Sequence, residues 1–175
     1  MHLVKEVSRA IPINSIPYDI TKSTQAIFMA EVLYRVIREE EPNPMLFHFL
    51  INSINYLDTL ENPIPDFHII FLFHLSRHLG FYPQNNFDGI MRYFDLESGR
   101  FKSAFVDSAK QMDEETSALW SSYLDSDYKE AEALKLNSLQ RKKVLDQQIK
   151  YFRNHVEGLG EIRSLDVLHA FFHNV

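Results

Sequence analysis

Residues 65–80 read PDFHIIFLFHLSRHLG, and the fold is decided in this stretch. Its five consecutive apolar residues, Ile69–Phe73, leave no polar face and suit either a buried helix or a buried strand. The 13 residues Phe67–Leu79 contain no glycine or proline, which is too long a run for a typical strand. Asp66 supplies a capping carboxylate at the start, and Gly80 supplies a left-handed stop at the end. We therefore predict a central helix that protein covers on all sides, because it is apolar almost all round.

Apolar residues at helical spacing predict further helices on both sides of the central one. We expect them at residues 21–41, 45–60, 113–123, 137–156 and 164–172, with a polar, helix-prone segment at 125–135. The inward faces predicted for the three longest are Ala26, Ile27, Ala30, Leu33, Tyr34 and Ile37; Leu46, Phe49, Leu50, Ile54 and Leu57; and Leu139, Val144, Leu145, Ile149 and Phe152. Asp113, Asn137 and Ser164 are the expected caps of the last three helices.

The pattern changes after Gly80. Residues 92–95 and 100–102 flank Leu96–Gly99, which predicts a small β-hairpin with glycine at its turn. Two strands alone are marginally stable in water, so this hairpin has to pack on the helices. The sequence thus predicts a mainly α fold over residues 21–175: one helical-bundle-like domain around a buried central helix, with one β-hairpin insertion. Residues 1–20, with two prolines between 11 and 19, indicate a strand and an irregular linker.

Composition excludes several classes of protein. The chain has 175 residues, enough for one domain with a substantial core, and its 14 Phe and eight Tyr argue against disorder. Without cysteine it has no disulfide scaffold, no thiolate zinc site and no cysteine catalysis. The P-loop, the dinucleotide-binding glycine fingerprint and the nucleophile elbow are absent as well. We expect neither export nor a membrane span, because there is no signal-like N-terminus and no run of 18 apolar residues.

Two histidine pairs have the spacing with which a metal site can begin. His74 and His78 lie four apart in the central helix, as do His169 and His173 near the C-terminus. A catalytic zinc site needs a third ligand and a base, and neither pair contains the internal glutamate of the zinc proteases. We favour His74 as a hydrogen-bonded core residue and His78 as a surface residue. A helical enzyme with a metal-dependent site around His74 and His78 is the alternative.

Charge is distributed unevenly along the chain, whose net charge is −6. Residues 106–136 contain three basic and eight acidic residues, whereas residues 137–163 contain six basic and three acidic ones. Two oppositely charged surfaces on one domain indicate contacts with protein or nucleic acid. The candidate DNA-binding residues are Arg141, Lys142, Lys143, Lys150 and Arg153. The alternative is a solvated face that pairs with the acidic segment.

Five short motifs resemble those of one known family when they are taken in order. They are REEEPN at 38–43, LGFYP at 79–83, YFDLESGRF at 93–101, YFRNH at 151–155 and SLDVL at 164–168. Over residues 21–172 the chain resembles the C-terminal helical domain of the RecO family. Many members of that family have a four-cysteine zinc knuckle after the central helix. This chain has the hairpin there and no cysteine, so the resemblance implies no zinc and no other cofactor.

The resemblance implies a non-catalytic role in bacterial DNA repair and recombination, in the cytoplasm at the nucleoid. RecO proteins bind single- and double-stranded DNA, anneal complementary strands, and help RecR to load RecA onto DNA covered by single-strand-binding protein. In that family the helical domain is a platform for RecR and for the acidic, Phe-ended tail of single-strand-binding protein. An oligonucleotide-binding barrel precedes it and makes most of the DNA contacts. The resemblance implies that residues 1–20 are the exit strand and linker of such a barrel, and we expect the barrel itself to be missing from this sequence.

An acidic tail that ends in phenylalanine requires an apolar slot with a cationic rim. Arg77, Phe81 and Tyr82 at the end of the central helix are our candidates for the slot, with Arg35 and Arg38 as the rim. The alternative is that Phe81 and Tyr82 only close the core. A scaffold that binds neither DNA nor the tail is the third interpretation of the chain.

Overall fold

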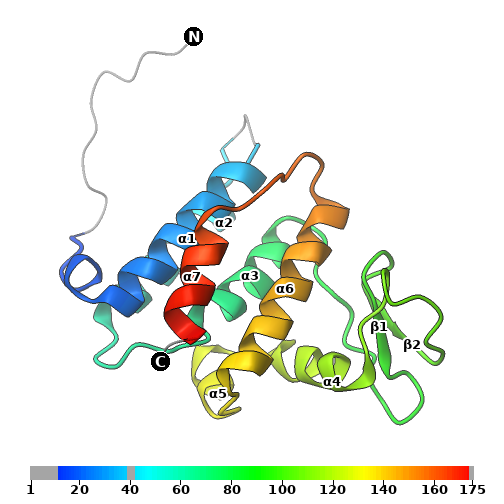
Figure 1. The fold of residues 1–175 in the computed structure, drawn as a ribbon. Helices are drawn as coiled ribbons and strands as arrows, with labels where there is room; N and C mark the ends of the chain where they lie inside the picture. The colour runs from blue at the N-terminus through cyan, green and yellow to red at the C-terminus, as the bar shows by residue number, and fades with distance from the viewer. Residues whose placement is uncertain (1–11, 39–41, 174–175) are drawn as a thin grey trace.

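Figure 1 shows a computed structural model of the chain, which describes residues 12–38 and 42–173. The elements are the 3-10 helix η1 (Ile16–Tyr18), the helices α1 (Ile20–Val36), α2 (Pro44–Thr59) and α3 (Phe67–His78), the strands β1 (Tyr93–Asp95) and β2 (Arg100–Lys102), and the helices α4 (Glu114–Tyr123), α5 (Tyr128–Glu132), α6 (Ser138–His155) and α7 (Ser164–His173). The mainly α fold with one hairpin is thereby confirmed. The strand predicted near the N-terminus, at residues 2–7, lies outside the described residues.

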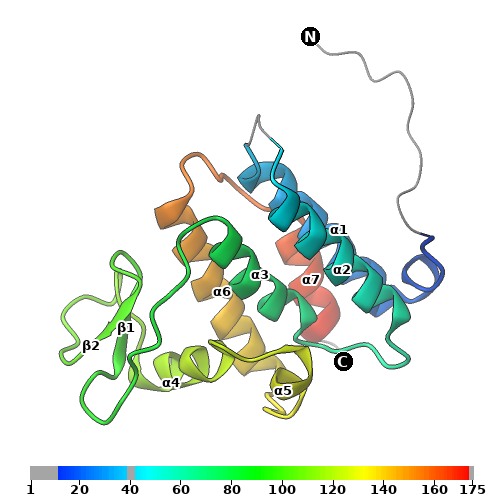
Figure 2. The same cartoon turned by 180° about the vertical axis from the view of Figure 1, so that it is seen from behind.

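Helix α3 lies at the centre of the domain, between α6 and the pair α1 and α2 (Figures 1 and 2). Nine of its 12 residues are buried, and α1, α2, α5 and α6 each contact it. The three residues that are not buried, His74, Arg77 and His78, lie in its C-terminal half. The prediction of a sheathed apolar helix is confirmed.

The start of α3 differs from the prediction, because the Asp66 side chain does not cap it. The backbone carbonyl of Asp66 accepts the N–H groups of Ile69 and Ile70 instead. Its buried carboxylate points away and accepts a hydrogen bond of 2.8 Å from the Tyr123 hydroxyl. The stop at the other end is as predicted: Gly80 has a φ of +84°.

Helix α1 differs from the prediction in its length and in its buried face. It ends at Val36 rather than at Glu41, since Ile37 is already extended, and residues 39–41 lie outside the described residues. Its buried residues are Lys22, Thr24, Gln25, Phe28, Met29, Val32 and Val36. Ile27 and Tyr34, predicted to face inward, are 63% and 88% exposed.

The buried face of α1 differs from the predicted one because two of its polar side chains form hydrogen bonds with buried backbone carbonyls. Gln25 Nε2 donates to the carbonyl of Ile64 at 2.8 Å, and Lys22 Nζ donates to the carbonyl of Asp58 at 3.1 Å. Burying a polar group is tolerated when its hydrogen bonds are made. Apolar spacing alone therefore placed the buried stripe of α1 only in part: Ala26, Leu33 and Ile37 do pack partly buried against the core, but Ile27 and Tyr34 do not.

The other helices agree more closely with the predictions. Asn137 forms a capping box with Gln140 at the start of α6, and Val144, Leu145, Ile149 and Phe152 are buried, but Leu139 is 55% exposed. Asp113 caps α4, as predicted. At the start of α7, the N–H and hydroxyl of Ser164 both donate to the carboxylate of Glu31 on α1. Glu31 thus takes the capping role that was predicted for Ser164.

The hairpin pairs Phe94 with Phe101, and both side chains are buried on its inner face. The ring of Phe94 packs against Trp120 of α4 and Tyr151 of α6, at centroid distances of 4.9 and 5.7 Å. The hairpin is therefore anchored to the helices, as its two-stranded size requires.

We predict that Gly99→Ala destabilises the protein through the hairpin turn. Gly99 has a φ of +65°, and an added Cβ would lie 2.8 Å from the hydroxyl of Tyr151, which itself donates to the carbonyl of Phe81. The left-handed backbone and the contact together should lower the free energy of unfolding by about 1–3 kcal/mol in urea denaturation. Gly89→Ala is the matched control, since it meets open space. Equal stability of the two variants would contradict the prediction.

Candidate peptide and nucleic-acid surfaces

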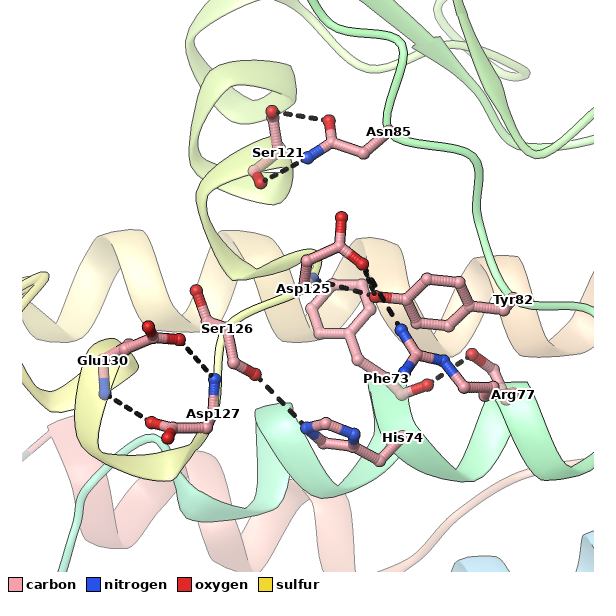
Figure 3. A network of polar contacts seen from close by, with 11 residues as sticks. Phe73, His74, Arg77, Tyr82, Asn85, Ser121, Asp125, Ser126, Asp127 and Glu130 are labelled. Carbon is pink, nitrogen blue, oxygen red and sulfur yellow. Dashed lines mark hydrogen bonds and ion pairs between the residues drawn. The ribbon is translucent and has the colours of Figure 1, made fainter.

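The C-terminal end of α3 presents a polar cluster on the surface, formed by Arg77, Tyr82 and Asp125 (Figure 3). The guanidinium carbon of Arg77 lies 4.1 Å from the centre of the Tyr82 ring, and its Nη2 lies 3.3 Å from Oδ1 of Asp125. The Tyr82 hydroxyl donates to the same carboxylate oxygen at 3.2 Å and accepts the N–H of Asp125 at 2.9 Å. We call these three residues the Arg77 cluster.

Tyr82 contributes a neutral hydroxyl to this cluster. Burial raises the pKa of the Tyr82 hydroxyl, which therefore remains a neutral donor. One turn earlier, His74 Nε2 lies 3.2 Å from the carbonyl of Ser126, and burial lowers the pKa of this imidazole. His74 is therefore the neutral, hydrogen-bonded residue that we expected. Figure 3 shows that Arg77 and His74 hold the same connection between α4 and α5.

Phe81, although next to Tyr82 in the chain, faces α6 rather than the cluster. Its ring stacks on His155 at a centroid distance of 5.2 Å and meets the edge of Phe152 at 5.0 Å. Phe81 thus closes the core, which is the simpler of the two roles considered for it. Tyr82 remains on the surface with Arg77.

Arg35 and Arg38 contact a different segment from the Arg77 cluster. Arg35 is paired with Glu31 and donates to the carbonyl of Leu159 at 3.4 Å. Arg38 donates to the carbonyl of Glu157. These two arginines tie α1 to the connection between α6 and α7. The structure therefore brings together Arg77 and Tyr82 but not the other three residues predicted for the slot and its rim.

The basic residues of α6 fall into an inner and an outer group. Arg141 points inward, with Nε 3.4 Å from Oδ1 of Asp66, and Lys142 pairs with Asp146 at 2.8 Å. Lys150 and Arg153 are exposed and contact no carboxylate among the described residues. The residues predicted to bind DNA therefore do not share one surface: Arg141 points into the domain, whereas Lys150 and Arg153 are exposed to solvent.

Lys143, Lys150 and Arg153 line one surface depression of about 350 Å³ between α6, α4 and α7. Ile149 and Leu165 supply apolar lining, and the carboxylates Asp113 and Asp146 lie among the three basic residues. Lys143 is only loosely paired, 3.5 Å from Glu115. Placed positive charge along an open surface is what phosphate groups require. This depression is the part of α6 suited to a polyanion.

The buried ion pair of Arg141 and Asp66 lies near a buried histidine, His68. Burial raises the pKa of the Asp66 carboxyl, while the Tyr123 hydroxyl and the Arg141 charge act in the opposite direction. Burial also lowers the pKa of His68 to about 3, so this imidazole is neutral at physiological pH. The crevice at His68 and Arg141 encloses only about 20 Å³, too little for a substrate. We assign these residues a structural role.

His74 and His78 do not form a metal centre with the other side chains that the structure describes. The ring of His78 stacks on Phe49 at a centroid distance of 4.6 Å, and the side chain of His173 lies outside the described residues. Residues 12–38 and 42–173 contain no group of three or more His, Asp or Glu side chains placed to hold a metal ion.

Comparison with known proteins identifies the family. The family model described as "Recombination protein O C terminal" matches residues 17–166. The chain belongs to the RecO family. It is 37% identical over 172 residues to the DNA repair protein RecO of Bacteroides fragilis, a match that covers 97% of this chain and 70% of the relative. The corresponding protein of Flavobacterium psychrophilum is 35% identical over 168 residues, which cover 96% of this chain and 69% of the relative. No solved structure matches the chain.

These matches confirm the family that the ordered motifs indicated. They place the chain among proteins of DNA repair and recombination. Within the residues that the structure describes, no helix has the length and apolarity to cross a membrane.

Sequence reasoning missed Asp125, which is the partner of both Arg77 and Tyr82. It lies 48 residues from Arg77, in a polar segment without a clear period. The only feature of the sequence that could have indicated a turn at this position is the residue type, because aspartate adopts a positive φ more readily than most residues. Asp125 does have a φ of +68°.

We predict that Arg141→Met lowers the free energy of unfolding by about 3 kcal/mol at pH 7, because it leaves the buried Asp66 carboxylate without its cation. Lys142→Met is the control: it removes an exposed ion pair of the same helix and should cost less than about 0.5 kcal/mol. The deficit of Arg141→Met should shrink as the pH falls through the raised pKa of the Asp66 carboxyl, because a protonated Asp66 needs no cation. A deficit that does not change with pH would contradict this assignment.

Proposed function

We propose that this chain is the helical interaction domain of a RecO protein, a non-catalytic partner-binding module of bacterial DNA repair and recombination. In this proposal it binds RecR and the acidic C-terminal tail of single-strand-binding protein, and thereby assists strand annealing and the loading of RecA on single-stranded DNA. The observation that carries the proposal is the family match over residues 17–166. The Arg77 cluster and the α6 depression are surfaces with chemistry suited to such partners.

The direct test is capture from a bacterial extract on the immobilised chain. RecR and single-strand-binding protein should both be retained. An extract whose single-strand-binding protein lacks its acidic tail serves as the control, and that protein should then be lost from the bound fraction. Retention of the tail-deleted protein, or of neither partner, would contradict the proposal.

The Arg77 cluster is our proposed site for the acidic tail. The half-exposed guanidinium of Arg77 stacks on Tyr82, so one surface offers a cation and an aromatic face. Charged hydrogen bonds to a carboxylate are stronger than neutral ones. An aromatic face also accommodates a terminal phenylalanine ring.

We predict that Arg77→Gln weakens the binding of an acidic peptide ending in phenylalanine by about tenfold or more, because it removes a charge-assisted contact. Fluorescence anisotropy with a labelled peptide measures the affinity. Arg92→Gln is a matched control, since Arg92 is also half-exposed and paired with one carboxylate, that of Glu114 at 3.0 Å. Equal affinities of the two variants would remove Arg77 from the site.

The α6 depression is our proposed DNA contact. We predict that Lys150→Glu combined with Arg153→Glu weakens single-stranded DNA binding and lowers the slope of log affinity against log salt by about 1.4, the value for two lost phosphate contacts. Lys142→Glu combined with Arg163→Glu is the control, because it changes the net charge equally outside the depression. An unaltered salt slope in the first variant would exclude these two residues.

A further inference from the structure

We propose that Asp125 is an internal competitor for the peptide site: its carboxylate occupies the donors of Arg77 and Tyr82 that an acidic ligand would use, and the ligand binds by displacing residues 125–127. This inference rests on the proposed function of the Arg77 cluster. It adds a regulating contact within the same chain.

The competing contact is visible in the hydrogen bonds of the cluster (Figure 3). A single oxygen of Asp125 receives both the Arg77 guanidinium at 3.3 Å and the Tyr82 hydroxyl at 3.2 Å. These are the two donors of the cluster that face a carboxylate. A carboxylate from another molecule can make these same two bonds only after Asp125 has left them, so the ligand and Asp125 compete for this pair of donors.

The Asp125 contact is held weakly enough to be displaced. The side chains of Arg77 and Asp125 are 53% and 63% exposed, and exposed ion pairs contribute little because water competes for both groups. The 3.3 Å separation is also longer than a strong charge-assisted hydrogen bond. A ligand with several carboxylates can therefore displace the single carboxylate of Asp125 from Arg77 and Tyr82.

Asp125 is also held in an unfavourable backbone conformation. Its φ of +68° lies in the left-handed region, which costs a residue with a Cβ more than it costs glycine. The Tyr82 hydroxyl accepts its N–H, so the segment 81–82 helps to keep that conformation. Release from the cluster would free Asp125 to return to an ordinary conformation.

The moving part is short, because both of its ends are anchored. Leu124 is buried before it, and the ring of Tyr128 stacks on Phe67 after it at a centroid distance of 4.3 Å. Residues 125–127 read Asp-Ser-Asp, so the segment is itself acidic and polar, like the ligand that it would exclude. Apart from the Asp125 contacts, it is held to α3 by the bond between His74 and the carbonyl of Ser126.

The test compares acidic-peptide affinity between the chain and its Asp125→Asn variant. Asparagine keeps the size of the side chain and tolerates the positive φ, but it gives up the charge. We expect the variant to bind a peptide of four aspartates with a C-terminal phenylalanine about three- to tenfold more tightly. Asp88→Asn is the matched control: it changes the net charge equally outside the cluster and the moving segment, at a carboxylate that binds the N–H groups of Ile90 and Met91, and it should change affinity less than twofold.

Arg77→Gln separates the failure of this inference from that of the proposed site. If Arg77→Gln weakens binding but Asp125→Asn leaves it unchanged, the site stands and the competition is excluded. If the peptide binds none of the variants, or binds Arg77→Gln as tightly as the unmodified chain, the site and the competition both fail. Asp125→Gly, which removes the carboxylate and relieves the backbone, is the second variant and should also bind more tightly. Weaker binding by both Asp125 variants would overturn the inference.

Discussion

The covering of α3 is the constraint on which the rest of the structure depends. Nine of its 12 residues are buried, so apolar side chains project on every side and water has to be excluded all round. Helices α1, α2, α5 and α6 provide most of that cover. Helices α4 and α7 complete it, because Trp120 of α4 packs on Phe73 and Phe172 of α7 packs on His68, at ring-centroid distances of 4.7 and 5.5 Å. Chemistry with other molecules is therefore confined to the outer faces and to the end of α3 at Arg77.

Buried polar side chains determine how helices α1 and α6 are oriented on α3. Gln25 of α1 binds the carbonyl of Ile64 just before α3, and Gln148 of α6 binds the carbonyl of Ile69 within it at 3.0 Å. Each bond satisfies a group that would be costly to bury alone. Because hydrogen bonds are directional while apolar contacts are not, these residues select one packing of α1 and α6 from several of similar apolar area.

The five basic residues of α6 show which parts of a candidate site can be predicted from the sequence and which cannot. Their spacing indicated one charged face, and three of them, Lys143, Lys150 and Arg153, do line one surface depression. Arg141 has the same charge but binds the buried Asp66. The difference was not predictable from charge, because it depends on an acidic group that approaches α6 from the start of α3.

The sequence by itself determined the central helix, the hairpin with its glycine turn, and the family. The helix and the hairpin are local features, since an apolar run or a turn is complete within a few neighbouring residues, and the family follows from the order of short motifs along the chain. Only the tertiary structure decided which stripe of α1 is buried, that Asp66 binds Tyr123 rather than capping α3, and that Asp125 lies on Arg77. The last two contacts join residues 57 and 48 positions apart. Such pairs exist only after packing brings separate helices together, and no periodicity in the chain encodes them.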